Sequence, residues 1–83
     1  MKNPKRPKTT CPGTVEKIIK SPFPQEPEKA EIAVEGADHL YREIRIENTL
    51  QDDKGNKVKL KLGAQVDVIV EADPKDTVPK NAS

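Results

Sequence analysis

The most regular alternation of hydrophobic and polar residues lies between residues 57 and 72. Apolar residues alternate with polar ones there, and Gly63 divides the stretch into segments 58–62 and 64–72. Successive side chains of a β-strand point to opposite faces, so each segment is predicted to be a strand with one buried face. The residues predicted to be buried in the second segment are Val66, Val68, Val70 and Ala72.

Three more strands are predicted earlier in the chain. Residues 28–35 and 41–50 alternate in the same way. The first strand, residues 14–20, is less regular because Ile18 and Ile19 are adjacent, which requires either a β-bulge or burial on both faces. The residues predicted to face inward in the two regular strands are Ala30, Ile32, Val34, Ile44 and Ile46.

Glycine and proline mark the turns and loops between these strands. Residues 51–56 combine Asp, Gly and Asn, which tolerate positive φ, and predict a hairpin turn between the third and fourth strands. Gly63 predicts a sharp bend between the fourth and fifth. Residues 21–27 are rich in proline and predict an extended, polyproline-like loop. Phe23 in this loop is expected either to cover one end of the core or to be an exposed anchor for a partner.

Five short antiparallel strands predict an all-β fold. Strands must pair or close to hide their edges, so we expect a small five-stranded antiparallel barrel of the OB-like or SH3-like type, with a two-sheet sandwich as the alternative. The barrel is predicted to span residues 13–73. Residues 1–12 and 74–83 are polar and contain proline, and they are predicted to be a disordered basic arm and a disordered tail.

The composition makes this core a small one. Hydrophobic residues make up 33% of the chain and charged residues 35%, with one Phe, one Tyr and no Trp. The core is therefore built from Val, Ile, Leu and Ala. A domain of this size buries only about 60% of the surface of its unfolded chain, so a dimer or a sheet extended across two chains would add stability.

The formal net charge is +1, but basic residues gather in two places. The N-terminal arm, with Lys5 and Arg6, carries no acidic residue and is a candidate tether to nucleic acid, or a solubilising tail. Lys57, Lys59 and Lys61 share the outward face of one predicted strand. They form either a second basic patch for nucleic acid or a charged edge that opposes aggregation.

Few residues suit catalysis or metal binding. His39 follows an aspartate in a predicted turn and is expected to be solvated, and Cys11 lies in the arm without an activating environment. One Cys and one His do not make a zinc site, and the acidic turn lacks the ligand pattern of a calcium loop. The sequence therefore predicts no catalytic residue, no metal and no cofactor.

Cys11 has no partner for an internal disulfide, which suits a reducing compartment. No apolar run approaches the roughly 20 residues of a membrane helix, and no apolar segment follows the basic N-terminus. We therefore expect a cytoplasmic location and no membrane partner.

One family resemblance is carried by three segments: Gly13-Thr14-Val15 with Ile18, the strand at residues 30–34, and the run at residues 60–66 that leads into Val68. Together they resemble the repeat of molybdate-binding small β-barrels, the Mop-like or TOBE family. The resemblance implies a small barrel that binds an oxyanion. The proline loop and the hairpin at residues 51–56 depart from the family pattern, and the family's oxyanion-binding residues have no assigned counterparts in this chain.

These features favour a non-catalytic interaction or accessory module. It would present Pro22, Phe23 and Pro24, or an exposed strand edge, to a protein partner or to a second copy of itself. One alternative is weak nucleic-acid binding through the basic arm and the face formed by Lys57, Lys59 and Lys61. Another is small-oxyanion binding at a subunit interface, as the family resemblance implies.

Overall fold

The computed structural model describes residues 6–40 and 42–81. The fold is all-β, as predicted, but these residues form six strands instead of five. The predicted third strand divides at Asn48 and Thr49 into two shorter strands. The elements are β1 (Lys8–Ile19), β2 (Lys29–Val34), β3 (Glu43–Glu47), β4 (Leu50–Gln51), β5 (Lys57–Val58), β6 (Gln65–Glu71) and the 3-10 helix η1 (Pro74–Asp76).

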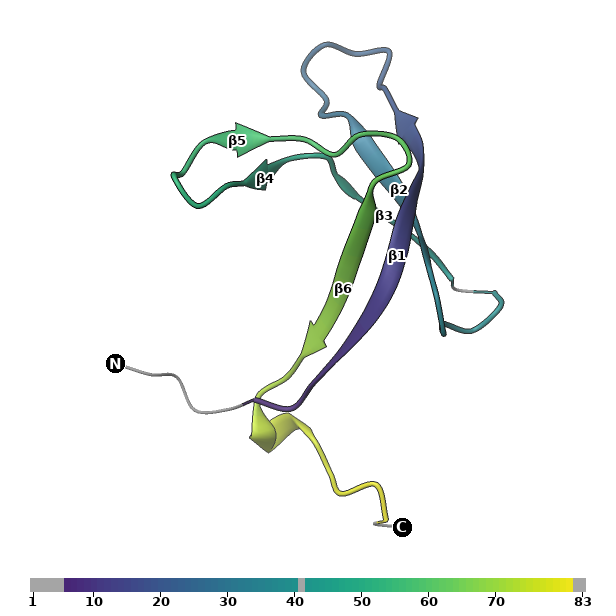
Figure 1. The fold of residues 1–83 in the computed structure, drawn as a ribbon, viewed down its shortest axis with the longest axis vertical. Helices are drawn as coiled ribbons and strands as arrows, with labels where there is room; N and C mark the ends of the chain where they lie inside the picture. The colour runs from purple at the N-terminus through teal and green to yellow at the C-terminus, as the bar shows by residue number, and fades with distance from the viewer. Residues whose placement is uncertain (1–5, 41, 82–83) are drawn as a thin grey trace.

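Four of the strands form one antiparallel sheet in the order β3-β2-β1-β6, and β4 pairs with β5 in a separate hairpin. Strand β1 is long enough to serve two neighbours. Its first half, residues 8–14, pairs with β6, and its second half, residues 13–19, pairs with β2. As Figure 1 shows, β1 and β6 run on as a two-stranded ribbon beyond the rest of the sheet, and the hairpin projects to one side.

The sheet curls but does not close, so the predicted barrel is wrong for the described part of the chain. Closure needs a pairing between the outer strands β3 and β6, and the intervening hairpin pairs only with itself. Its two strands have two residues each, which is too short to bridge the gap. The radius of gyration is 15.9 Å, against about 12 Å for a compact domain of this length.

Strand β1 begins at Lys8 and not near Gly13, so the second part of the predicted disordered arm belongs to the sheet. Pro12 lies inside this strand. Its C=O accepts a hydrogen bond from the Glu35 N–H at 2.9 Å, so the missing N–H of Pro12 faces the end of β2 and not the ladder with β6. A proline is tolerated in a strand where it removes no ladder donor.

Of the two alternatives predicted for β1, a bulge or burial on both faces, the bulge is present. The register with β2 shifts between Val15 and Lys17, which leaves Glu16 as the extra residue. Directly paired residues share one face of a sheet, and Ile18 lies opposite Ala30. Residues three positions apart in a regular strand lie on opposite faces. The bulge therefore returns Ile18 to the same face as Val15.

This inner face carries the core. The fully buried apolar residues are Val15, Ala30 and Ile32. Partly buried residues pack around them: Ile18, Val34, Ile44, Leu60, Ala64, Val66 and Val68. Val70, predicted to be buried, is 62% exposed because it lies on the ribbon, beyond the end of β2.

The outer face is mostly charged, with one buried acid. Glu31, predicted to face solvent, is only 4% exposed. Its carboxylate accepts a hydrogen bond from Arg45 Nε at 2.9 Å and lies 3.8 Å from Lys17 Nζ. Two neighbouring strands thus supply the cations that a buried carboxylate requires.

The predicted turns form as expected. In the hairpin turn, Asp52 Oδ1 accepts hydrogen bonds from the backbone N–H groups of Lys54 and Asn56, and Gly55 has a φ of 85°. Gly63 makes the predicted bend with a φ of 84°. The strand predicted over 58–62 is wrong in extent, because β5 ends at Val58 and the chain then passes to the bend without pairing in a strand.

Beyond β6, Asp73 caps η1 through a hydrogen bond from Lys75 N to its carboxylate, within the tail predicted to be disordered. Residues 77–81 form no strand or helix. Lys5 of the predicted basic arm and Tyr41, the first residue of the predicted third strand, lie outside the described part of the chain. Among the described residues, no helix has the length and apolar character needed to cross a bilayer.

Candidate functional site

An apolar groove of about 200 Å³ opens on the inner face of the sheet, beneath the hairpin. Its lining comes from β2, β3, β4 and β6, and from the segment between β5 and β6. The only charged residue among them is Asp67. The lining residues are Ile32, Ile44, Ile46, Leu50, Leu60, Val66, Asp67 and Val68. The groove extends the core to a surface that solvent reaches, as the 37% exposure of Ile46 shows.

Asn48 holds the hairpin over this groove. Its side chain is buried and makes a two-way contact with the backbone of Leu60, accepting from the N–H at 2.7 Å and donating to the C=O at 3.2 Å. Its amide also donates to Glu28 Oε2 at 2.9 Å. These bonds connect the β3–β4 junction to the segment that follows β5, so one side chain sets the position of both hairpin strands.

The groove ends at β6, which is an edge strand of the sheet. The backbone hydrogen bonds at its two ends show which N–H and C=O groups of β6 face the open edge. The Ala64 C=O accepts from Val15 N of β1 at 2.9 Å, and the Ala72 N–H donates to the C=O of Pro7, the residue before β1, at 3.0 Å. Alternate residues of a strand point to opposite sides, so the backbone groups that face the open edge belong to Gln65, Asp67, Ile69 and Glu71.

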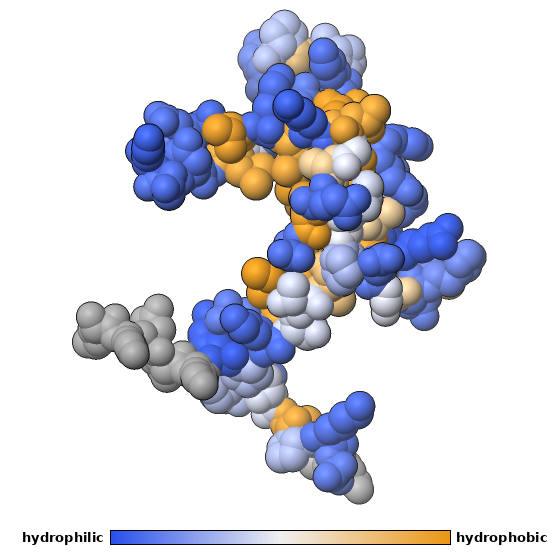
Figure 2. Space-filling view, viewed as in Figure 1, coloured by the Kyte–Doolittle hydropathy of each residue, from blue (hydrophilic) through white to orange (hydrophobic). Residues whose placement is uncertain are grey.

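Large apolar side chains are exposed along this edge strand. Ile69 is 57% exposed on the outer face and Val70 is 62% exposed on the inner face. Figure 2 shows hydrophobic surface between the hairpin and the sheet and again along the ribbon. The open edge, the exposed valine and the groove thus adjoin one another on β6.

The proline loop, the predicted binding segment, folds back on itself. Phe23 C=O accepts from Glu26 N at 3.1 Å in a β-turn, and Ser21 Oγ donates to Glu26 Oε1 at 2.9 Å. This closed turn is not the extended path that the prolines predict. Phe23 is 61% exposed, so it does not cover the core. With Pro22 and Pro24 also exposed, the loop is a small protrusion between β1 and β2, and none of its residues lines the groove.

The three predicted lysines are exposed but not equivalent. Lys57 lies in β5 and Lys59 just after it, and both line a shallow hollow beside Asn48 and Thr49. Lys59 Nζ is 4.0 Å from the Glu28 carboxylate. Lys61 belongs to the turn before β6 and is not among the residues that line this hollow.

The basic arm does not converge with these lysines. Arg6 is exposed and precedes β1, whose first residue, Lys8, pairs with Glu71 at the end of β6. Lys59 and Lys61 lie just before the start of β6. The two basic groups therefore lie at opposite ends of this strand, which separates the parts that the nucleic-acid hypothesis combines (Figure 1).

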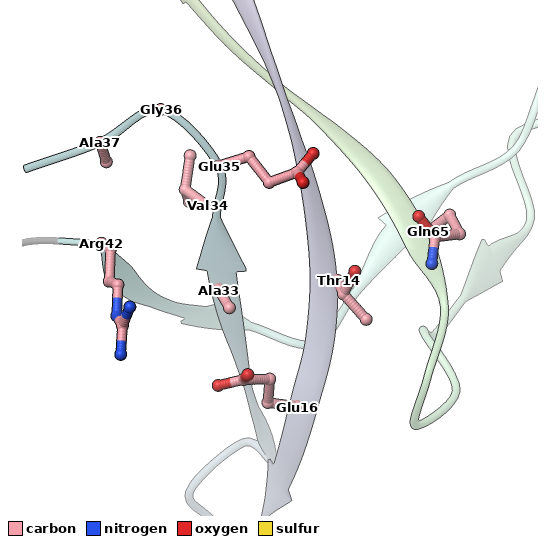
Figure 3. Close-up of a pocket in the computed structure, with 9 residues that line it drawn as sticks. All are labelled: Thr14, Glu16, Ala33, Val34, Glu35, Gly36, Ala37, Arg42 and Gln65. Atoms are coloured by element: carbon pink, nitrogen blue, oxygen red, sulfur yellow. The ribbon is translucent and has the colours of Figure 1, made fainter. Parts of the chain in front are cut away.

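A wider, open hollow of about 790 Å³ lies on the outer face of the sheet, where Thr14 of β1 pairs with Ala33 of β2 and with Gln65 of β6, and it extends to the β2–β3 turn. Figure 3 shows Arg42 on one side of it, with the Glu16 carboxylate directed toward that side and the Glu35 carboxylate directed away from it, across β1. The lining thus carries two carboxylates and one guanidinium, and this excess of negative charge disfavours an anion. This arrangement does not supply the basic cradle that oxyanion binding requires.

The outer face also brings together Glu16, Glu31 and Glu43, whose carboxylate oxygens lie within 4.8 Å of one another. Arg45 and Lys17 already neutralise Glu31. The cluster is sufficiently explained as part of a charged sheet surface, and we assign no metal to it.

The residues that line the groove and its edge were missed as a site by sequence reasoning. One signal was present: Ile69 occupies a position of β6 where alternation calls for a polar residue. Leu50 and Ile46 gave no such signal, because their exposure depends on where the hairpin lies. Comparison with known protein families, with curated proteins and with solved structures finds no match.

Proposed function

We propose that this chain is a non-catalytic interaction module that binds an extended polypeptide segment along β6. The incoming segment pairs with the open edge and places alternate side chains over the apolar groove. Strand addition of this kind takes its affinity from main-chain hydrogen bonds and its specificity from pockets for every second side chain.

The observation that carries this proposal is the position of the groove beside an unpaired strand edge. Ile46 and Leu50 remain 37% and 39% exposed in it, although both are large apolar residues. Burial of such side chains contributes about 1.5 to 3 kcal/mol each. Because little more than a third of each side chain is still exposed, a bound segment that covers them gains the corresponding part, on the order of 0.5 to 1 kcal/mol each, without any rearrangement of the sheet.

The open edge of β6 is a better candidate for the binding surface than the proline loop. The loop offers a single large apolar side chain, Phe23, on a turn that satisfies its own hydrogen bonds. The edge offers backbone donors and acceptors together with an apolar surface. Only the edge combines the two components that strand addition uses.

A displayed library of peptides with alternating apolar and polar residues tests the proposal. Peptides that bind should shift the amide resonances of Ile46, Leu50 and Ile69 in the isotopically labelled full chain. Leu50→Asp should abolish this binding, and Phe23→Ala should leave it unchanged. The amide spectrum of each variant shows whether it remains folded.

The opposite pattern would contradict the proposal. If selected peptides shift the resonances of the proline loop and lose binding in the Phe23→Ala variant, the loop is the binding surface. If the library yields no binder to a folded chain, the edge does not accept extended peptides.

A further inference from the structure

We infer that the segment bound by β6 is β6 of a second copy, paired antiparallel about a two-fold axis at Val68. This inference rests on the proposed function and names the partner. It predicts one continuous sheet of eight strands, formed from the four-stranded sheet of each copy. The reasons are the hydrogen-bonding pattern, the distribution of charge along the strand and the open core of the isolated chain.

Hydrogen bonding and strand direction fix which registers are allowed. A two-fold axis perpendicular to the sheet keeps both inner faces on the same side, so each residue pairs with a partner of the same face. The axis must then lie midway between one residue and the same residue of the second copy, so each allowed register is named by that residue. Val68 is the midpoint of Gln65–Glu71, so an axis there pairs the whole strand and brings the open-edge groups of Asp67 and Ile69 opposite one another.

Charge selects the same register. An axis at Asp67 places two aspartates opposite each other, and an axis at Ile69 places Asp67 opposite Glu71. Like charges directly opposite in a sheet are destabilising. The axis at Val68 instead pairs Asp67 with Ile69 and Gln65 with Glu71, so it alone pairs the full strand without opposing two acids.

This register also fills the groove. It places Val70 of each copy opposite Val66 of the other, and Val66 lines the groove. Val70 is 62% exposed in the isolated chain. Dimerisation therefore inserts an exposed valine from each copy beside the exposed apolar lining of its partner, and the exchange is reciprocal.

The small core and the open edge of the isolated chain favour dimerisation. Its buried apolar core among the described residues consists of Val15, Ala30 and Ile32, and its sheet leaves the strand β6 open. A domain of this length has a small stability margin even when it is compact. The other outer strand, β3, carries the charged residues Glu43, Arg45 and Glu47, and the unpaired side of the first half of β1 is protected by Pro12 and carries Lys8. These features oppose edge pairing. β6 has neither a proline nor a lysine.

The first test is the mass of the full chain by sedimentation over a range of concentrations. We expect a species of twice the chain mass of 9.2 kDa that dissociates on dilution. A chain that remains monomeric up to about 1 mM, which means an association free energy weaker than about −4 kcal/mol, would overturn the inference.

The second test determines the register with engineered cysteines, in a Cys11→Ser background because Cys11 pairs with Val68 within one chain. Val68→Cys should form a disulfide between copies under mild oxidation. Val66→Cys and Val70→Cys should each cross-link poorly alone and readily when mixed, since each lies opposite the other. Cross-linking of Val66→Cys alone in preference to Val68→Cys would overturn the register.

The third test uses two lysine substitutions on opposite faces of β6. Val70→Lys places a charge in the partner's groove and should weaken the dimer at least about tenfold, the effect of losing one buried apolar side chain. Ile69→Lys lies opposite Asp67 of the other copy and should leave the dimer as strong or stronger. Equal weakening by both would contradict the inference.

These results separate the inference from the proposed function. A monomeric chain whose edge still binds library peptides retains the function and loses the second copy as its partner. A dimer that cross-links at Val68 and releases its subunits when such peptides are added supports both. A monomer that binds no peptide overturns both.

Discussion

Gly13 is the residue at which β1 changes neighbours. It pairs with Val34 of β2 on one side and Val66 of β6 on the other. A Cβ atom there would lie 2.8 Å from Ile32 Cγ2 and 3.1 Å from the Ala33 carbonyl. The φ of Gly13 is not positive, so glycine is required there by close packing and not by the backbone conformation of a turn.

We predict that Gly13→Ala destabilises the fold by about 1 to 3 kcal/mol, the usual effect of forcing an extra carbon into a packed core. Denaturant unfolding followed by circular dichroism measures this change. Thr10→Ala, at an exposed position of the same strand, is the control and should have a much smaller effect. A Gly13→Ala variant as stable as the wild type would show that this part of the sheet has space to adjust.

Asn48 is the second residue whose substitution we expect to destabilise the structure. Its side chain links three segments through the bonds to Leu60 and Glu28. Removing one partner from a buried hydrogen bond leaves the other unsatisfied and costs about 1 to 3 kcal/mol.

We expect Asn48→Ala to release the hairpin from the sheet before the sheet unfolds. Hydrogen exchange at the Leu60 amide should accelerate by about tenfold or more, the equivalent of 1.4 kcal/mol, while exchange in β2 changes less. Asn56→Ala, an exposed asparagine in the hairpin turn, serves as the control. Equal acceleration throughout the chain would mean that hairpin and sheet unfold as one unit.

At the scale of elements, the proline loop and β2 differ sharply in their contribution to stability. The loop exposes its one large apolar residue, and β2 buries Ile32 to 3% exposure. Composition does not reveal this difference, since both segments contain apolar residues between polar ones.

Phe23→Ala should therefore change the free energy of unfolding by no more than about 0.5 kcal/mol, as for other surface positions. Ile32→Ala should cost about 2 to 5 kcal/mol, because it removes buried carbon atoms and leaves a cavity. Thermal melts of the two variants provide the measurement. A large loss of stability in Phe23→Ala would restore the idea that this ring covers the core.

At the scale of the whole molecule, the curled sheet leaves its groove and the edge of β6 open. If β6 pairs between copies, stability depends on protein concentration, because association with a second folded copy shifts unfolding by mass action. The melting temperature should rise with chain concentration across two orders of magnitude. It should depend less on concentration in the Val70→Lys variant, and identical melting of the wild type at all concentrations would argue against a dimer.

Much of the local structure could be predicted because it depends on neighbouring residues. Alternation in residues 28–35 and 64–72 located β2 and β6. The adjacent Ile18 and Ile19 required either a bulge or burial on both faces, and a bulge forms in β1. The turn at residues 51–56 follows from an aspartate side chain and a glycine φ, which are local properties.

The extent of pairing was not predictable in the same way. Residues 8–12 contain a proline and no regular apolar pattern, yet they pair with β6 because β6 continues past Gly13, where the pairing of β1 with β2 ends. Conversely, residues 59–62 alternate well but do not pair as a strand. Backbone hydrogen bonds need a partner at the right distance, and that partner is set by the whole fold.

The sequence by itself thus determined the all-β class, the inward faces of the regular strands and the positions of the tight turns, because these follow from side-chain period and backbone preference over a few residues. Only the tertiary structure decided that the sheet stays open, that Val70 is exposed and that Ile46 and Leu50 line a groove. These features depend on which distant strands meet, and here the short hairpin held by Asn48 does not connect β3 to β6.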